Sequence, residues 1–273
     1  MVGTLSLMVG ILVLAILMNG VAANGRSSSF SPAISASSSG RCPVGDLPSQ
    51  PAYDPSNHYL YVPNQVSHNV SILTANCIEI ANVTLGKGND PIAAVFNPSN
   101  NDVYVSGGNH HKIYVIHNTA LVHTISSSLI DSPWGMVYDP AVQSVIVTDY
   151  ADASVTAIYG MVPFDVTPVG YDPVAVAYDP YENQLLVTNS FSNNVTIIGA
   201  SSLDVIGSIP VGADPQQVAF DPQDSMDYVA NVNSNNVSVI FLDTVVSTIS
   251  LSVGPDGVAF DQKNLLETIA QLL

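Results

Sequence analysis

Residues 217–241 read QVAFDPQDSMDYVANVNSNNVSVIF, and this stretch decides the fold because its pattern recurs along the chain. The pair Asp-Pro, once Asn-Pro, marks five copies, and a degenerate sixth copy follows them. The marked positions are Asp54, Asn97, Asp139, Asp179, Asp221 and Asp261, at steps of 43, 42, 40, 42 and 40 residues. A period in the low forties is typical of the four-stranded blades of a β-propeller.

The spacing inside each of the five copies is constant. Seven residues after the marker stands an aromatic or aliphatic residue, and sixteen residues after it stands a β-branched residue. These residues are Tyr61, Tyr104, Ile146, Leu186 and Tyr228, then Val70, Ile113, Val155, Val195 and Val237. Short apolar runs bounded by Asn, Asp, Gly and Pro indicate strands. The sequence therefore predicts an all-β propeller over residues 51–261, with five four-stranded antiparallel blades plus one strand of a sixth, 258–260.

Two interpretations of the ring compete. The chain forms either a complete five-bladed ring with a tail or a copy truncated from a larger propeller, and the extra strand favours truncation. An open ring would expose sheet edges, so self-association is expected in that case. The apolar spacing in residues 262–273 predicts a C-terminal helical tail.

The first 50 residues differ in character from the repeat. An apolar run at residues 7–18, followed by small residues at 21–23, predicts a signal peptide or N-terminal anchor over residues 1–23. The run is short for a membrane span, which needs about 20 residues. Residues 24–50 are serine-rich and predict a linker. We therefore expect an extracellular or cell-surface protein that contacts membrane only through an uncleaved N-terminal segment.

Several short motifs resemble a known family. The stretches Tyr61-Val62-Pro63-Asn64, Leu186-Val187-Thr188-Asn189 and Tyr228-Val229-Ala230-Asn231 are similar to the signature of YVTN-repeat β-propellers. Ile209-Pro210-Val211-Gly212 and Asp214-Pro215 extend the resemblance. The resemblance implies an archaeal or bacterial surface-layer-type or secreted propeller, in a family that usually closes with more blades. YVTN propellers are also similar to lactonase-like and lyase-like propellers, which act on small cyclic substrates at the channel mouth.

The chain has two cysteines, Cys42 and Cys77. An even count in an exported chain predicts one disulfide, which would pin the end of the linker to the first blade. The alternative is a pair of buried thiols.

The charge balance of the chain excludes some classes of binding partner. The formal net charge is −17, with 22 acidic and 5 basic residues. Such a chain cannot neutralise a run of phosphates, so nucleic-acid binding is excluded. Attraction to anionic lipid is disfavoured for the same reason. Scarce lysine and arginine limit self-repulsion in acid, which suggests exposure to an acidic medium.

Repeated polar residues mark one rim of the expected ring. The loops that lead into the first strands carry Asp90, Asp131, Asp172 and Asp214. Four carboxylates on one rim could hold Ca²⁺, and the alternative is that each caps its own turn. The loops after the second strands carry Asn64, Asp149, Asn189 and Asn231, as turn formers or ligands.

Other candidates carry weaker signals. His68 and His111 hold equivalent loop positions and could share a transition metal, but the sequence offers no third ligand and solvated loop histidines are the better explanation. Sequons place possible glycosylation at Asn69, Asn82, Asn194 and Asn236. Nucleophile, phosphate-loop and dinucleotide motifs are missing from the sequence. Trp134 is expected to pack within a blade.

These observations favour a non-catalytic binding or structural module that presents rim loops to a protein or carbohydrate at the cell surface, with no cofactor unless Ca²⁺ binds. The shortage of Glu and Arg in the blades counts against an enzyme. The alternative is a lactonase- or lyase-like enzyme that acts on a small substrate at the channel mouth.

Overall fold

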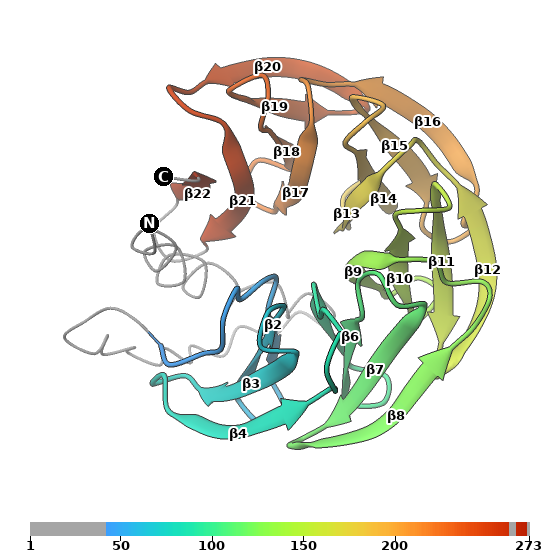
Figure 1. Ribbon diagram of the computed structural model, residues 1–273. Coiled ribbons are helices and arrows are strands. Elements are labelled where there is room, and N and C mark those ends of the chain that lie inside the picture. The colour runs from blue at the N-terminus through green and yellow to red at the C-terminus, as the bar shows by residue number, and fades with distance from the viewer. Residues whose placement is uncertain (1–41, 262–265, 272–273) are drawn as a thin grey trace.

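The computed structural model describes residues 42–261 and 266–271. In this part of the chain the secondary structure is β-sheet, and five four-stranded antiparallel sheets stand around a ring (Figure 1). Each sheet is one blade, with its first strand nearest the centre and its fourth strand on the outside. The predicted all-β propeller is confirmed.

The blades follow one another along the chain. Blade 1 consists of β1 (Ala52–Asp54), β2 (Tyr59–Asn64), β3 (Asn69–Thr74) and β4 (Glu79–Thr84). Blade 2 consists of β5 (Ala94–Asn97), β6 (Asp102–Ser106), β7 (Lys112–His117) and β8 (Ala120–Ser126). Blade 3 consists of β9 (Pro133–Asp139), β10 (Ser144–Asp149), β11 (Ser154–Tyr159) and β12 (Val162–Pro168). Blade 4 consists of β13 (Pro173–Asp179), β14 (Gln184–Asn189), β15 (Asn194–Gly199) and β16 (Val205–Pro210). Blade 5 consists of β17 (Pro215–Asp221), β18 (Met226–Asn231), β19 (Asn236–Phe241) and β20 (Thr244–Ser250).

A sixth, two-stranded sheet follows blade 5. It pairs β21 (Pro255–Asp261) with β22 (Leu266–Gln271). The sequence predicted one strand here and a helix after it, and the helix prediction is wrong for residues 266–271. The apolar spacing that suggested a helix lies in a segment that β21 recruits as its antiparallel partner. Figure 1 shows this sheet and blade 1 on the two sides of an opening in the ring.

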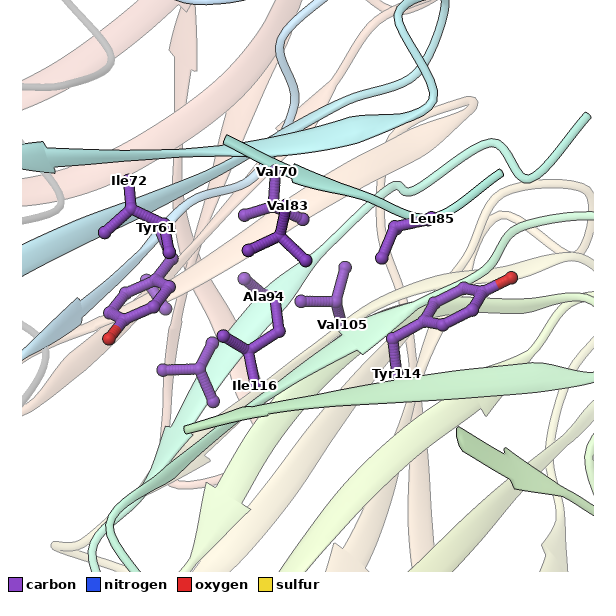
Figure 2. Packing of buried hydrophobic residues seen from close by; sticks show 11 residues of the cluster. Tyr61, Val70, Ile72, Val83, Leu85, Ala94, Val105, Tyr114 and Ile116 are labelled. Atoms are coloured by element: carbon purple, nitrogen blue, oxygen red, sulfur yellow. The ribbon is translucent and has the colours of Figure 1, made fainter. Parts of the chain in front are cut away.

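The core lies between neighbouring blades. Figure 2 shows one such interface, where Tyr61 and Ile72 of blade 1 face Val105 and Ile116 of blade 2. Similar clusters join blade 2 to blade 3, blade 3 to blade 4 and blade 4 to blade 5. Burying one Val, Leu or Ile side chain contributes roughly 1.5–3 kcal/mol. The second and third strands supply most of these residues, so they are apolar on both faces.

Hydroxyl groups at one repeated position link blades to each other. Ser106 Oγ accepts from Ala93 N–H at 2.9 Å and donates to the Trp134 carbonyl of the next blade at 2.7 Å. Thr188 makes the same two contacts, to Ala175 and Gln216. These bonds satisfy backbone groups at the start of the first strand, where β13 also shifts register against β14.

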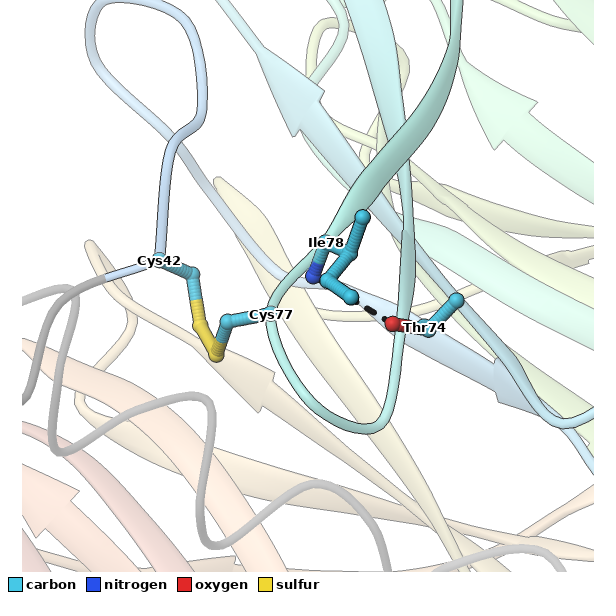
Figure 3. The surroundings of a disulfide bond; sticks show 4 residues. All are labelled: Cys42, Thr74, Cys77 and Ile78. Carbon is cyan, nitrogen blue, oxygen red and sulfur yellow. Dashed lines mark hydrogen bonds between the residues drawn. A yellow bond between two sulfur atoms is a disulfide. The ribbon is translucent and has the colours of Figure 1, made fainter. Parts of the chain in front are cut away.

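The predicted disulfide is confirmed. Cys42 and Cys77 are bonded, with Cα atoms 4.9 Å apart, and the bond joins the chain ahead of blade 1 to the turn between β3 and β4 (Figure 3). Cys42 and Val44 pack on Leu60, Val62 and Leu73 of blade 1. The predicted signal peptide or anchor lies outside the described residues. Within those residues, no helix has the length and apolar character to span a bilayer.

Candidate functional site

The loops of the ring fall on two faces because the strands of each blade run antiparallel. The loops after the second strands and the loops between blades share one face, which we call the rim face. The turns between first and second strands, and between third and fourth strands, share the opposite face. The four rim aspartates and the four second-strand residues singled out in the sequence lie on the rim face.

Each rim aspartate meets a side chain from the loop after a second strand. His68 Nδ1 lies 3.1 Å from Asp90 Oδ1, and His111 Nδ1 lies 3.0 Å from Asp131 Oδ1. Tyr150 donates its hydroxyl hydrogen to Asp172 Oδ2 at 3.1 Å. Asn233 Nδ2 donates to Asp214 Oδ2 at 3.1 Å.

Each of the four rim aspartates thus has a side-chain partner of its own. Among the described residues, no group of three or more His, Cys, Asp or Glu is arranged to hold a metal ion. The Ca²⁺ prediction therefore has no ligand cluster behind it in that part of the chain. His68 and His111 likewise do not share a site, because each ring nitrogen faces its own aspartate.

The second-strand residues of the rim are buried. Asn64, Asn189 and Asn231 are 0 % exposed. Each donates from Nδ2 to a strand carbonyl and to side chains that begin the third strand, as Asn64 does to Asn69 Oδ1 at 2.7 Å and Ser71 Oγ at 3.1 Å. They hold the turn between the second and third strands, so they do not present polar groups to a partner.

Blade 3 replaces this asparagine with Asp149, which is also 0 % exposed. Thr156 Oγ1 donates to Asp149 Oδ2 at 2.5 Å, and the backbone N–H of Asp131 donates to Oδ1 at 3.2 Å. Burial raises the pKa of Asp149 to about 7, against the lowering effect of these two hydrogen bonds, and the charges of Asp152 and Asp131 raise it further. This carboxyl group therefore changes protonation near neutral pH.

One sector of the rim joins titratable and aromatic side chains around Asp149. We call His111, Asp131, Trp134, Asp149 and Tyr150 the blade 3 sector. His111 Nδ1 faces Asp131, and in the described part of the chain Nε2 has no hydrogen-bond partner. The imidazole is 63 % exposed. A carboxylate that fixes one ring nitrogen leaves the other available to accept a proton from a bound molecule.

Aromatic side chains border the same sector. The Trp134 and Tyr150 rings lie 5.2 Å apart between centroids, tilted by 32°. Trp134 lies in β9 and Tyr150 directly follows β10 of the same blade, so this contact is packing within blade 3, as the sequence led us to expect. The pair adds an aromatic surface to this sector, and small-molecule sites are lined largely by apolar and aromatic side chains.

The opposite face holds a comparable pair and an unexpected buried acid. His117 Nδ1 lies 2.8 Å from Asp102 Oδ1. Asp227 is 2 % exposed, and its Oδ1 has no hydrogen-bond partner among the described residues. Burial raises its pKa to about 8, and the charges of Asp179, Glu182, Asp243 and Asp224 add to the shift.

The four sequon asparagines differ in their surroundings. Asn69, Asn194 and Asn236 accept hydrogen bonds from the buried rim asparagines, so their side chains are already engaged. Asn82 is exposed on the outer strand β4.

Comparison with known proteins gives a fold but no family. No protein-family model matches the sequence. No curated protein matches it either. Among solved structures, a streptogramin B lyase matches with a TM-score of 0.72 at 12 % identity, over 83 % of this chain and 76 % of that chain. Virginiamycin B lyase from Staphylococcus aureus matches with a TM-score of 0.73 at 11 % identity, over 82 % of this chain and 77 % of that chain.

Two further structures extend the picture. A catalytically inactive His-to-Ala form of the S. aureus lyase with quinupristin matches with a TM-score of 0.70 at 12 % identity, over 82 % of this chain and 84 % of that chain. The WD40 β-propeller domain of Doa1 matches with a TM-score of 0.68 at 10 % identity, over 82 % of this chain and 76 % of that chain. At these identities the likeness is one of fold, and the resemblance to YVTN-repeat proteins stays a prediction.

The functional expectation drawn from the sequence needs correction. It favoured a non-catalytic binding or surface-layer module and counted against an enzyme. Three of the similar structures are lyases, so the comparisons favour the enzymatic alternative over that expectation. The sequence argument weighed the shortage of Glu and Arg in the blades, whereas the rim carries histidine–aspartate and tyrosine–aspartate pairs.

Proposed function

We propose that the protein is a propeller enzyme of the lyase or lactonase type, which opens a small cyclic ester at the rim face. The observation that carries the proposal is the His111–Asp131 pair, backed by the buried carboxyl of Asp149. The lyase structures with the same ring architecture support the reaction class.

His111 is the catalytic base in this proposal. Asp131 holds Nδ1, so Nε2 removes a proton from substrate or from a water molecule. In an elimination, the proton leaves the carbon next to a carbonyl, a carbon–carbon double bond forms, and the ester C–O bond breaks to release a carboxylate. In a hydrolysis, the activated water instead adds to the ester carbonyl before the C–O bond breaks.

Asp149 is a positioning residue because it contacts the backbone of Asp131 and not the outside. Its Oδ1 accepts from the Asp131 N–H, which fixes the loop that carries the histidine's partner. The Trp134–Tyr150 pair would contact the apolar parts of a cyclic substrate. The Cys42–Cys77 disulfide supports a location in an oxidising compartment, and we propose the cell exterior.

Quinupristin and simple lactones are the substrates to test, followed by mass spectrometry of the full chain's products. Elimination opens a cyclic ester without a change of mass, whereas hydrolysis adds the mass of one water. We expect His111→Gln to lower the rate by about 100-fold or more, since a general base contributes on the order of 10²–10⁴ in rate.

His117→Gln is the matched control because His117 faces Asp102 in the same way on the opposite face. It should keep the rate of the unmodified protein. The proposal is wrong if the protein opens none of these esters, or if His111→Gln and His117→Gln have equal rates.

A further inference from the structure

Blades 3, 4 and 5 contain many acidic residues and no basic ones. Residues 124–261 include 16 Asp and Glu residues and no Lys, Arg or His. The lysines of the blades, Lys87 and Lys112, and all six histidines lie within residues 58–123. Figure 1 shows blades 3–5 as one continuous arc of the ring. Among the described residues, the one ion pair that reaches this arc joins His111 to Asp131.

Two aromatic side chains stand exposed on the rim face of this arc. Tyr171, in the loop between blades 3 and 4, is 68 % exposed, and Phe191, in the loop after β14, is 72 % exposed. Their ring centroids lie 6.4 Å apart, with the planes at 82°. The Tyr171 N–H donates to Ser192 Oγ at 2.8 Å, and the Ser190 N–H donates to the Asp172 carbonyl at 2.9 Å. These bonds fix the backbone that carries the pair, although both rings are open to solvent.

The repeat does not require these two rings. In blade 5 the residue that donates its N–H to the loop serine is Ala213, in the place of Tyr171. The residue before that serine is Asn233, in the place of Phe191. The same loops therefore form with alanine and asparagine, so the fold alone does not explain the aromatic pair of blade 4. Exposed apolar patches of this kind mark interaction sites.

Asp172 joins this pair to the Trp134–Tyr150 pair. It follows Tyr171 in the chain, and its Oδ2 accepts the hydroxyl hydrogen of Tyr150 at 3.1 Å. Burial raises the pKa of Tyr150, and the negative charges of Asp172 and Asp214 raise it further, so both carboxylates act on this part of the rim. We call this set of side chains the aromatic patch: Trp134, Tyr150, Tyr171, Asp172 and Phe191.

The two carboxylates at the aromatic patch are bonded to neutral donors. Asp172 accepts from the Tyr150 hydroxyl group. Asp214 accepts from Gln216 Nε2 at 2.6 Å and from Asn233 Nδ2 at 3.1 Å. These donors orient the carboxylates but carry no positive charge to offset theirs. Aromatic faces attract cations, and neighbouring carboxylates add to that attraction.

We propose that the aromatic patch, together with Asp214, binds a small organic cation, a molecule with a quaternary or protonated amine on an apolar or aromatic body. The rings contact the body and the cationic group, and Asp172 and Asp214 supply the opposite charge. This site goes beyond the proposed ester opening because binding needs no reaction. It would remain if the protein opened no ester.

Equilibrium dialysis of the full chain against N-benzylpyridinium, which contains no ester, tests the proposal. At physiological ionic strength, exposed charges farther apart than about 8 Å are largely screened, so general attraction to the acidic chain is suppressed. We expect saturable binding, about 3-fold or more tighter than that of 4-benzylpyridine, which has the same two rings and is uncharged at pH 8. Absence of saturable binding, or equal affinity for the two compounds, would overturn the proposal.

Trp134 reports where the cation binds because it is the only tryptophan of the chain. Pyridinium ions quench tryptophan fluorescence on contact, so the fluorescence should fall in parallel with the bound fraction. Binding that leaves the fluorescence of Trp134 unchanged would place the cation outside the aromatic patch and contradict the proposed site.

Two matched pairs of variants separate this site from the net charge. Phe191→Ala should weaken binding about 3-fold or more, whereas Tyr181→Ala, which disrupts the exposed Tyr181–Phe241 pair on the opposite face, should not. Asp172→Asn should also weaken binding, and asparagine tolerates the φ of 54° at this position. Asp204→Asn removes the same charge from the turn between β15 and β16 on the opposite face and should keep the affinity. If Asp172→Asn and Asp204→Asn weaken binding equally, the acidic chain attracts the cation without a site.

Discussion

Thr156 donates its hydroxyl hydrogen to a carboxylate oxygen of Asp149 at 2.5 Å, the reverse of the hydrogen bond that the equivalent residues form in three other blades. There an asparagine Nδ2 donates to a serine or threonine oxygen, as Asn231 does to Ser238 at 3.0 Å. Blade 3 thus keeps the shape of the repeat and exchanges a permanently neutral amide for a group that ionises.

Replacing Asp149 with asparagine should make the fold less sensitive to pH. The pKa of Asp149 is raised from 3.8 to about 7 in the folded state, so the folded state binds this proton more tightly than the unfolded state. The stabilisation is complete below pH 3.8 and is lost as pH rises from there to about 7, by on the order of 4 kcal/mol. We expect Asp149→Asn to unfold at higher urea than the unmodified protein at pH 8. The exposed loop variant Asp152→Asn is the control, and an equal gain from both would contradict the assignment to Asp149.

Replacing Asp227 with leucine should stabilise the seam between blades 4 and 5. Leu60, Val103, Val145 and Leu185 hold the equivalent position in the other blades. The pKa of Asp227 is raised from 3.8 to about 8 in the folded state. Between pH 4 and pH 8 the carboxyl therefore ionises in the unfolded state but stays protonated in the folded state, so the unmodified protein should lose stability across this range. The gain from Asp227→Leu should therefore be larger at pH 8 than at pH 4 in thermal unfolding. A gain independent of pH would show that packing alone is responsible.

Removing the Ser106 hydroxyl should loosen the contact between blades 2 and 3. Ser106→Ala leaves the Ala93 N–H and the Trp134 carbonyl without this partner in a buried place. An unsatisfied buried polar group costs about 1–3 kcal/mol, so urea denaturation should show a loss of that size. Ser250→Ala, at the exposed end of β20, should change stability little. Equal effects from the two variants would argue against the inter-blade role.

The double variant Cys42→Ser, Cys77→Ser should be destabilised by about 3–4 kcal/mol in the chain-entropy description. The bond closes a loop with a sequence separation of 35 residues and holds residues 42–48 on blade 1. Equilibrium unfolding with and without a reducing agent measures the loss. Reductant should have no effect on the double variant, and a loss below 1 kcal/mol would indicate that noncovalent contacts alone hold the segment.

The repeat predicted the fold because each blade is a local unit. Tyr61, Tyr104 and Val229 are buried against blades that have the same sequence pattern. The spacing of apolar residues was therefore sufficient to predict the fold. The last strand, β22, was mistaken for a helix because the apolar spacing of one short segment fits both the helical and the strand period. Only its pairing with β21 shows that it is a strand.

The candidate site was harder to predict because its contacts join loops from different blades. His111 and Asp131 are separated in the sequence by two strands, β7 and β8, and no local pattern connects them. The repeated aspartates suggested a common metal site, yet among the described residues they form no group of three or more ligands. Asp227 could have been found by aligning the five complete copies, since the other four have Leu or Val at this position.

Asp227 also makes the protein exchange protons with its buffer when it unfolds. At pH 6 the folded chain holds a proton on this carboxyl, and the unfolded chain releases it, because an ordinary aspartate is ionised at that pH. The heat absorbed on unfolding therefore includes the heat of protonating the buffer. Calorimetric unfolding enthalpies at a single pH should differ between phosphate and an amine buffer, and the slope against buffer ionisation enthalpy counts the protons that the fold retains.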